Sequence, residues 1–139
     1  MQISEHYPAF ATRTLLVLTN NELAKLYQGE GREIMEYEII DTAVQKALPQ
    51  DGRKDGIAMK DPDAEKRQRL VELYGRLNAR LQELITKGFD DIILCAPEAN
   101  KNELVAALHP DVEKRVKSVV PKNLASMELS HVIRILFET

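Results

Sequence analysis

The sequence is poor in aromatic side chains: tryptophan is absent, and aromatic residues make up only 5% of the 139 positions. This scarcity argues against a surface that binds sugars or bases by stacking. The chain has a single cysteine, Cys95, so no disulfide can form within it. Cys95 lies in an apolar run without a basic neighbour, which indicates a buried thiol rather than a nucleophile.

Long apolar runs and a strong excess of one charge are absent as well. No run approaches the roughly 18 apolar residues that a membrane-spanning helix needs, and the first residues lack the pattern of a signal peptide. We therefore expect a cytoplasmic protein without a membrane partner. The net charge of −3 provides no overall basic field, so we expect no DNA partner.

Hydrophobic residues account for 44% of the sequence, a share typical of a globular chain. The length of 139 residues predicts a single domain over residues 1–139. Residues 1–11 show no periodicity and contain Pro8, so we expect an N-terminal arm there.

The first part of the chain predicts three antiparallel strands. Residues 12–19 include a continuous apolar run, which is typical of a central strand covered on both faces. Asn20-Asn21 indicates a turn after this strand. Strands at 22–28 and 32–40 follow, and Gly29-Glu30-Gly31 indicates a tight turn between them. The third strand alternates apolar and charged residues, as an edge strand does. This alternation places Met35, Tyr37 and Ile39 on one face and Glu36 and Glu38 on the other.

The second half predicts helices and strands in alternation. Asp61-Pro62 starts a long helix that Gly88 ends. A close packing contact would explain Gly75 within this helix, because glycine is unfavourable there. Its apolar stripe comprises Leu70, Leu73, Tyr74, Leu77, Leu81, Leu84 and Ile85. The remaining elements are, in order, a strand at 89–96, a helix capped by Asn100, a helical piece at 111–116, a strand at 117–120 and a helix capped by Ser126.

The resulting order, β-β-β-α-β-α-β-α, is that of the ribonuclease H-like fold. Right-handed crossovers then give an α/β, three-layer arrangement, in which helices flank a five-stranded mixed sheet with strand order 3-2-1-4-5. The strand at 89–96 would lie beside the strand at 12–19 in the centre of this sheet. The segment at 41–61 contains two Asp-Gly pairs and is predicted to be irregular.

A nuclease of that fold needs carboxylates that converge on divalent metal ions from the first strand, the first helix and the end of the fourth strand. The first strand, at 12–19, has no carboxylate and ends at the neutral Asn20. Glu98 follows the fourth strand and Glu65 or Glu72 lies on the long helix, which makes an incomplete set. We therefore predict no metal site, no cofactor and no catalytic residue.

Two groups of basic residues are candidates for binding nucleic acid. Lysine and arginine contact the phosphates of RNA, so either group is suited to such contacts. Solvated surface charge is the alternative interpretation of both. The first group is Arg53, Lys54, Lys60 and Arg67, and the second is Lys114 and Arg115.

Most of the chain resembles the bacterial host-attachment protein family. In the first half the resemblance is carried by residues 14–27, TLLVLTNNELAKLY. In the second half it is carried by IILCAP at 92–97, ELVAAL at 103–108, VEKRV at 112–116 and VPKNL at 120–124. The order and spacing of these motifs carry the resemblance, rather than any one of them.

That family is similar in turn to the middle domain of archaeal and eukaryotic peptide release factors and to bacterial release-factor-like proteins. In those domains a Gly-Gly-Gln loop before the long helix helps to hydrolyse peptidyl-tRNA. The matching loop here, at 51–61, has Gly52 and Gly56 but no Gly-Gly-Gln. The resemblance therefore implies a module that associates with the ribosome, tRNA or structured RNA without hydrolysis.

Two other functions stay open. One is a regulatory domain that binds protein partners, with a homo-oligomer formed through the edge strand at 32–40 as one form of it. The other is a peptidyl-tRNA hydrolase that uses a loop of unrecognised sequence.

Overall fold

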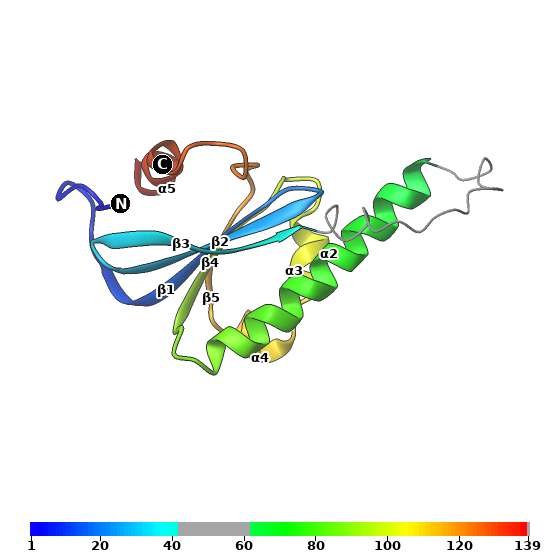
Figure 1. Ribbon diagram of the computed structural model, residues 1–139, viewed down its shortest axis with the longest axis horizontal. Helices are drawn as coiled ribbons and strands as arrows, with labels where there is room; N and C mark the ends of the chain where they lie inside the picture. Colours follow the sequence, from blue (N-terminus) through cyan, green and yellow to red (C-terminus); the bar gives the residue numbers. More distant parts are fainter. Residues whose placement is uncertain (42–61, 139) are drawn as a thin grey trace.

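The computed structural model describes residues 1–41 and 62–138. Its strands are β1 (Phe10–Thr19), β2 (Leu23–Gly31), β3 (Glu33–Asp41), β4 (Asp91–Cys95) and β5 (Val116–Val120). Its helices are α2 (Pro62–Ile85), α3 (Lys101–Ala106), α4 (Pro110–Glu113) and α5 (Leu129–Glu138). The strands form one sheet in the order β3-β2-β1-β4-β5 (Figure 1). This confirms the predicted α/β class and strand order.

β1 is the central strand of the sheet. It pairs antiparallel with β2 on one side and parallel with β4 on the other. Leu15, Leu16, Val17 and Leu18 are each at most 1% exposed. A strand that is covered on both faces needs such a continuous apolar run, so the prediction for this segment is confirmed.

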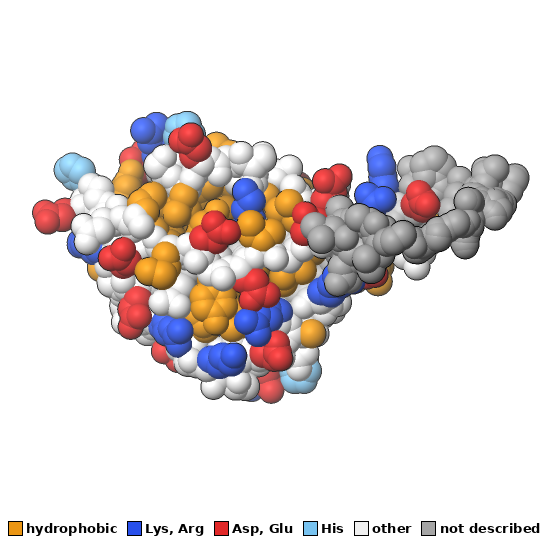
Figure 2. Space-filling view, viewed as in Figure 1, with side chains coloured by type: hydrophobic (Ala, Val, Ile, Leu, Met, Phe, Trp, Pro, Cys, Tyr) orange, Lys and Arg blue, Asp and Glu red, His pale blue; other side chains and the backbone are white. Residues whose placement is uncertain are grey.

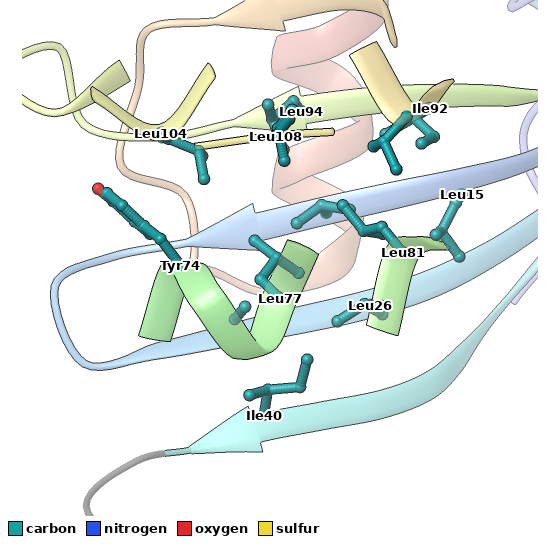
Figure 3. Close-up of a cluster of buried hydrophobic side chains, with 14 of the residues drawn as sticks. Leu15, Leu26, Ile40, Tyr74, Leu77, Leu81, Ile92, Leu94, Leu104 and Leu108 are labelled. Atoms are coloured by element: carbon teal, nitrogen blue, oxygen red, sulfur yellow. The ribbon is translucent and has the colours of Figure 1, made fainter. Parts of the chain in front are cut away.

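Each face of the sheet carries its own hydrophobic core. Leu15 and Val17 of β1 join Leu26 of β2 in the core beneath α2, α3 and α4. In Figure 3 the side chains of these helices and of the strands point toward one another. Leu16 and Leu18 join the core on the other face, where α5 packs. Because successive side chains point to opposite faces, one strand serves both cores.

α2 packs on the first core with only part of its length. The stripe residues Leu70, Leu73, Tyr74, Leu77, Leu81 and Leu84 are at most 6% exposed, as predicted. The side chains of residues 64–68 are all exposed, and Figure 1 shows the first turns of the helix extending past the sheet. In the described part of the chain, no helix is long and apolar enough to cross a membrane.

Arg13 of β1 fastens the other end of α2. Its Nη1 donates a hydrogen bond to the Lys87 carbonyl oxygen at 2.7 Å, and its guanidinium lies 4.2 Å from the centroid of the Phe89 ring. Gly88, between these two residues, has a φ of +104°, which glycine adopts without strain. The predicted glycine at the end of this helix is therefore confirmed, and the turn into β4 is held by β1.

The prediction of which β3 side chains share a face of the sheet is wrong. Ile34 and Ile40 are buried, whereas Met35 and Ile39 are 50% and 47% exposed. The pairing of β3 with β2 contains a register shift, and a bulge of this kind reverses the facing of the residues that follow it. Ile34 therefore packs in the core beneath α5 and Ile40 in the core beneath α2.

The predicted tight turn between β2 and β3 is present, but it lies at Gly31-Arg32 rather than at Gly29-Glu30-Gly31, and the predicted cap of the last helix is wrong. β2 continues to Gly31, whose φ is +62°. Gly29 lies within the strand, where a Cβ atom would be 2.5 Å from Cε2 of Phe10. The Phe10 ring of β1 thus explains this glycine. α5 begins at Leu129 rather than directly after Ser126.

The packing contact expected at Gly75 is wrong, because a Cβ atom there would meet nothing within 4 Å. Glycine inside a helix costs about 1 kcal/mol relative to alanine. We therefore expect Gly75→Ala to raise the free energy of unfolding by about 1 kcal/mol in a urea titration. Gly88→Ala is the matched control and should lower it, because its φ is positive. A Gly75→Ala protein less stable than the wild type would contradict this prediction.

The Cys95 thiol is fully buried at the end of β4, as predicted. Burial raises its pKa from 9.0 to about 12. Above pH 9 the thiol ionises in the unfolded chain but not in the folded one, so stability falls as the pH rises. We expect this contribution to approach about 1.4 kcal/mol per pH unit and to be absent in Cys95→Ala, as measured by urea unfolding across the alkaline range. Identical pH dependences in the two proteins would contradict it.

Candidate functional site

A crevice lies where β1 and β4 end. These strands are parallel neighbours, so the loops that follow them meet at one edge of the sheet, where open α/β sheets bind ligands. The first turns of α2 form the opposite wall. The crevice has a volume of about 320 Å³ and is lined by Asn21, Glu22, Lys66, Arg67, Arg69, Leu70 and Asn100.

Side-chain amides fix both loops of the crevice. Asn20 Oδ1 accepts hydrogen bonds from the backbone N–H groups of Glu22 and Leu23, at 2.7 and 2.8 Å. Asn100 Nδ2 donates to Asn21 Oδ1 at 2.5 Å, which joins the loop after β4 to the loop after β1. The predicted capping role of the Asn100 side chain is wrong, because it forms no cap hydrogen bond with α3.

Three cations line the α2 side of the crevice. Lys66 and Arg67 are exposed, and Arg69 is half-buried. The Nε atom of Arg69 is buried and finds no hydrogen-bond partner among the described residues. Cationic side chains beside the amides of Asn21 and Asn100 suit an anion with several oxygen acceptors, such as a phosphate. The crevice therefore presents groups that are suited to an anion, with the carboxylate of Glu22 also in its lining.

Tyr74 lies one helical turn beyond Leu70 on α2, with its ring in the first core. Its hydroxyl group is buried and has no hydrogen-bond partner in the described part of the chain. Burial, together with the negative charge of Glu103, raises the pKa of Tyr74 to about 12. The hydroxyl therefore stays protonated and neutral near neutral pH.

The structure does not bring the two predicted basic groups together. Arg67 lies in the crevice, whereas Lys114 and Arg115 precede β5, at the amino ends of the parallel strands. The backbone N–H of His109, just before α4, donates to Asn78 Oδ1 of α2 at 2.8 Å. Asn78 follows Arg67 by eleven residues, a distance of about 16 Å along the helix. The second group therefore belongs to a different surface.

Five of the predicted residues lie outside the described residues. Their roles as RNA contacts, and as the counterpart of the release-factor loop, stay predictions. They are Arg53, Lys54, Lys60, Gly52 and Gly56.

Sequence reasoning missed the part that asparagines play in this crevice. Asn21 was interpreted as a turn residue and Asn100 as a helix cap. Both follow strands that were correctly predicted to be parallel neighbours, and that position at the carboxyl end of the sheet is the signal that identifies them.

The carboxylates considered for a metal site do not assemble. Within residues 1–41 and 62–138, no group of three or more His, Cys, Asp or Glu residues is placed to hold a metal ion. Glu98 Oε2 instead lies 3.9 Å from the Lys101 Nζ atom. The side chain of Asn20 is engaged in its own turn.

Comparisons with protein-family models and with curated proteins find no match for the chain. They give no support to the resemblance to the host-attachment protein family.

Solved structures with a similar fold are translation factors. One is an archaeal translation termination factor, aRF1, with a TM-score of 0.53 and 15% identity over 77% of this chain and 29% of that protein. Another is Saccharomyces cerevisiae Dom34, a translation termination-like factor, with a TM-score of 0.53 and 13% identity over 91% of this chain and 33% of that protein. The chain spans about a third of the length of each factor, and at this identity it shares with that third the fold alone.

Proposed function

We propose that the chain is a module that binds structured RNA, of the ribosome or of tRNA, through the crevice at the ends of β1 and β4. The observation that carries the proposal is the group of Lys66, Arg67 and Arg69 beside two side-chain amides. Lysine and arginine contact the phosphates of RNA, and side-chain amides contact phosphate and sugar oxygens. The exposed cations lie on the part of α2 that projects past the core, where a large partner has access.

The fold supports the same proposal. The factor aRF1 acts in translation termination, and Dom34 is involved in RNA quality control pathways and interacts with Hbs1. These roles belong to proteins about three times as long as the matched region. For this chain, these roles support only the proposal that it binds RNA.

The proposal is for binding without hydrolysis. Peptide release by factors of this type uses a Gly-Gly-Gln loop, and the sequence contains no Gly-Gly-Gln. A peptidyl-tRNA hydrolase would need another catalytic group. The crevice offers cations and amides, which hold a phosphate in place.

We expect the chain to bind tRNA and ribosomes at low salt and to dissociate as the salt concentration rises, because phosphate contacts release counterions. Replacing both Lys66 and Arg67 by alanine should reduce the slope of log affinity against log salt by about 2, one for each cation. Fluorescence anisotropy with labelled tRNA measures this slope, and co-sedimentation with ribosomes checks it on the larger partner.

The matched control is Lys114→Ala with Lys117→Ala, which removes the same charge at the amino ends of the strands, away from the crevice. We expect this control to keep the wild-type slope. Equal losses in the two double variants would show that net charge, rather than the crevice, determines binding. Absence of binding at low salt would overturn the proposed function.

A further inference from the structure

β3 is an edge strand that is paired along only part of its outer side. The N-terminal arm covers its beginning: Ile3 N–H donates to Arg32 O at 2.7 Å, and Ile34 N–H donates to Met1 O at 2.8 Å. Beyond Ile34, no backbone hydrogen bond joins residues 35–40 to any described segment other than β2. An open edge of this kind is a template for a further strand.

The side chains along this open edge combine apolar and acidic groups. Met35 and Ile39 are 50% and 47% exposed, and Glu36 between them is exposed as well. Figure 2 looks onto this side of the molecule, where hydrophobic and acidic side chains lie next to one another over β3. Met35 and Glu36 precede the bulge at Tyr37, whereas Glu38 and Ile39 follow it. Met35 and Glu38 therefore lie on the face that α2 covers, and Glu36 and Ile39 lie on the face that α5 covers.

The strand carries four carboxylates, those of Glu33, Glu36, Glu38 and Asp41, and no cation. Two cations partly offset them: Arg80 Nε of α2 lies 2.8 Å from Glu38 Oε1, and the N-terminal ammonium lies 4.0 Å from Glu33 Oε2. Beside the ion pair of Arg80 and Glu38, a hollow of about 300 Å³ between β3 and α2 has room for side chains of an added strand.

The charge of β3 disfavours a second copy of the chain as the occupant. Pairing the β3 strands of two copies would bring the four carboxylates of each strand to one seam, with no cation from either strand. Like charges directly opposite each other in a sheet are destabilising. A strand with cations at these positions would gain from the same contacts.

We propose that the open edge of β3 binds an extended, basic segment of another protein as an additional strand. Main-chain hydrogen bonds along residues 35–40 hold the segment. On each face of the sheet it places one cation beside a glutamate and one apolar residue beside an exposed apolar side chain: Glu36 with Ile39 on one face, and Glu38 with Met35 on the other. This surface differs in both charge and position from the crevice that is proposed to bind RNA. The result of the test for one proposal therefore does not decide the other.

The test uses the full chain and a fluorescent nine-residue peptide that repeats Lys-Lys-Val-Val, so that each face of the added strand carries both residue types, with binding measured by anisotropy at low salt. We expect Glu36→Lys and Ile39→Lys each to weaken binding at least tenfold, because both place a cation beside the added strand. Glu113→Lys, a charge reversal on exposed α4, and the double variant lacking Lys66 and Arg67 should bind as the wild type does. Thermal melting confirms that each variant is folded, and slowed amide exchange of residues 35–40 locates the peptide.

Two control peptides separate strand addition from simple attraction. One carries glutamate in place of lysine, and the other is N-methylated at four consecutive central residues so that it cannot pair as a strand. We expect at least tenfold weaker binding of both. Equal binding of the N-methylated peptide, absence of binding by the lysine peptide, or self-association of the chain through β3 in sedimentation experiments would overturn the proposal.

Discussion

The double-sided burial of β1 is the constraint on which the other layers depend. Burying one aliphatic side chain fully contributes roughly 1.5–3 kcal/mol, and β1 buries Leu15, Leu16, Val17 and Leu18 in succession. Such a strand needs a helix layer on each face and a paired strand on each side. α2 and α5 supply the layers, and β2 and β4 supply the pairing. The loops of the crevice are the continuations of β1 and β4.

The parts of the fold that could be predicted are those whose signal lies within one segment. The continuous apolar run of β1 and the long stripe of α2 each determine how their own residues face the cores. The facing of β3 could not be predicted, because it depends on a bulge that exists only in the pairing with β2. Gly29 was taken for a turn residue for the same reason, since the ring that explains it belongs to β1.

Less of the candidate site could be predicted from the sequence. The charge of a basic side chain can be identified from the sequence, and Arg67 was predicted to contact RNA for that reason. The hydrogen bond between Asn21 and Asn100 joins residues 79 positions apart, so no local sequence pattern predicts it. The sequence indicated two basic groups but not their relative positions, and the structure separates Arg67 from Lys114 along the length of α2.

α2 is anchored in the core over only part of its length. Its buried stripe and the Arg13 contacts clamp the helix from Leu70 to its end, while residues 64–68 project with exposed side chains. Neither core includes any of residues 64–68. Substitutions of Lys66 and Arg67 therefore leave both cores intact, and under the proposed function RNA affinity and fold stability can change independently in sequence.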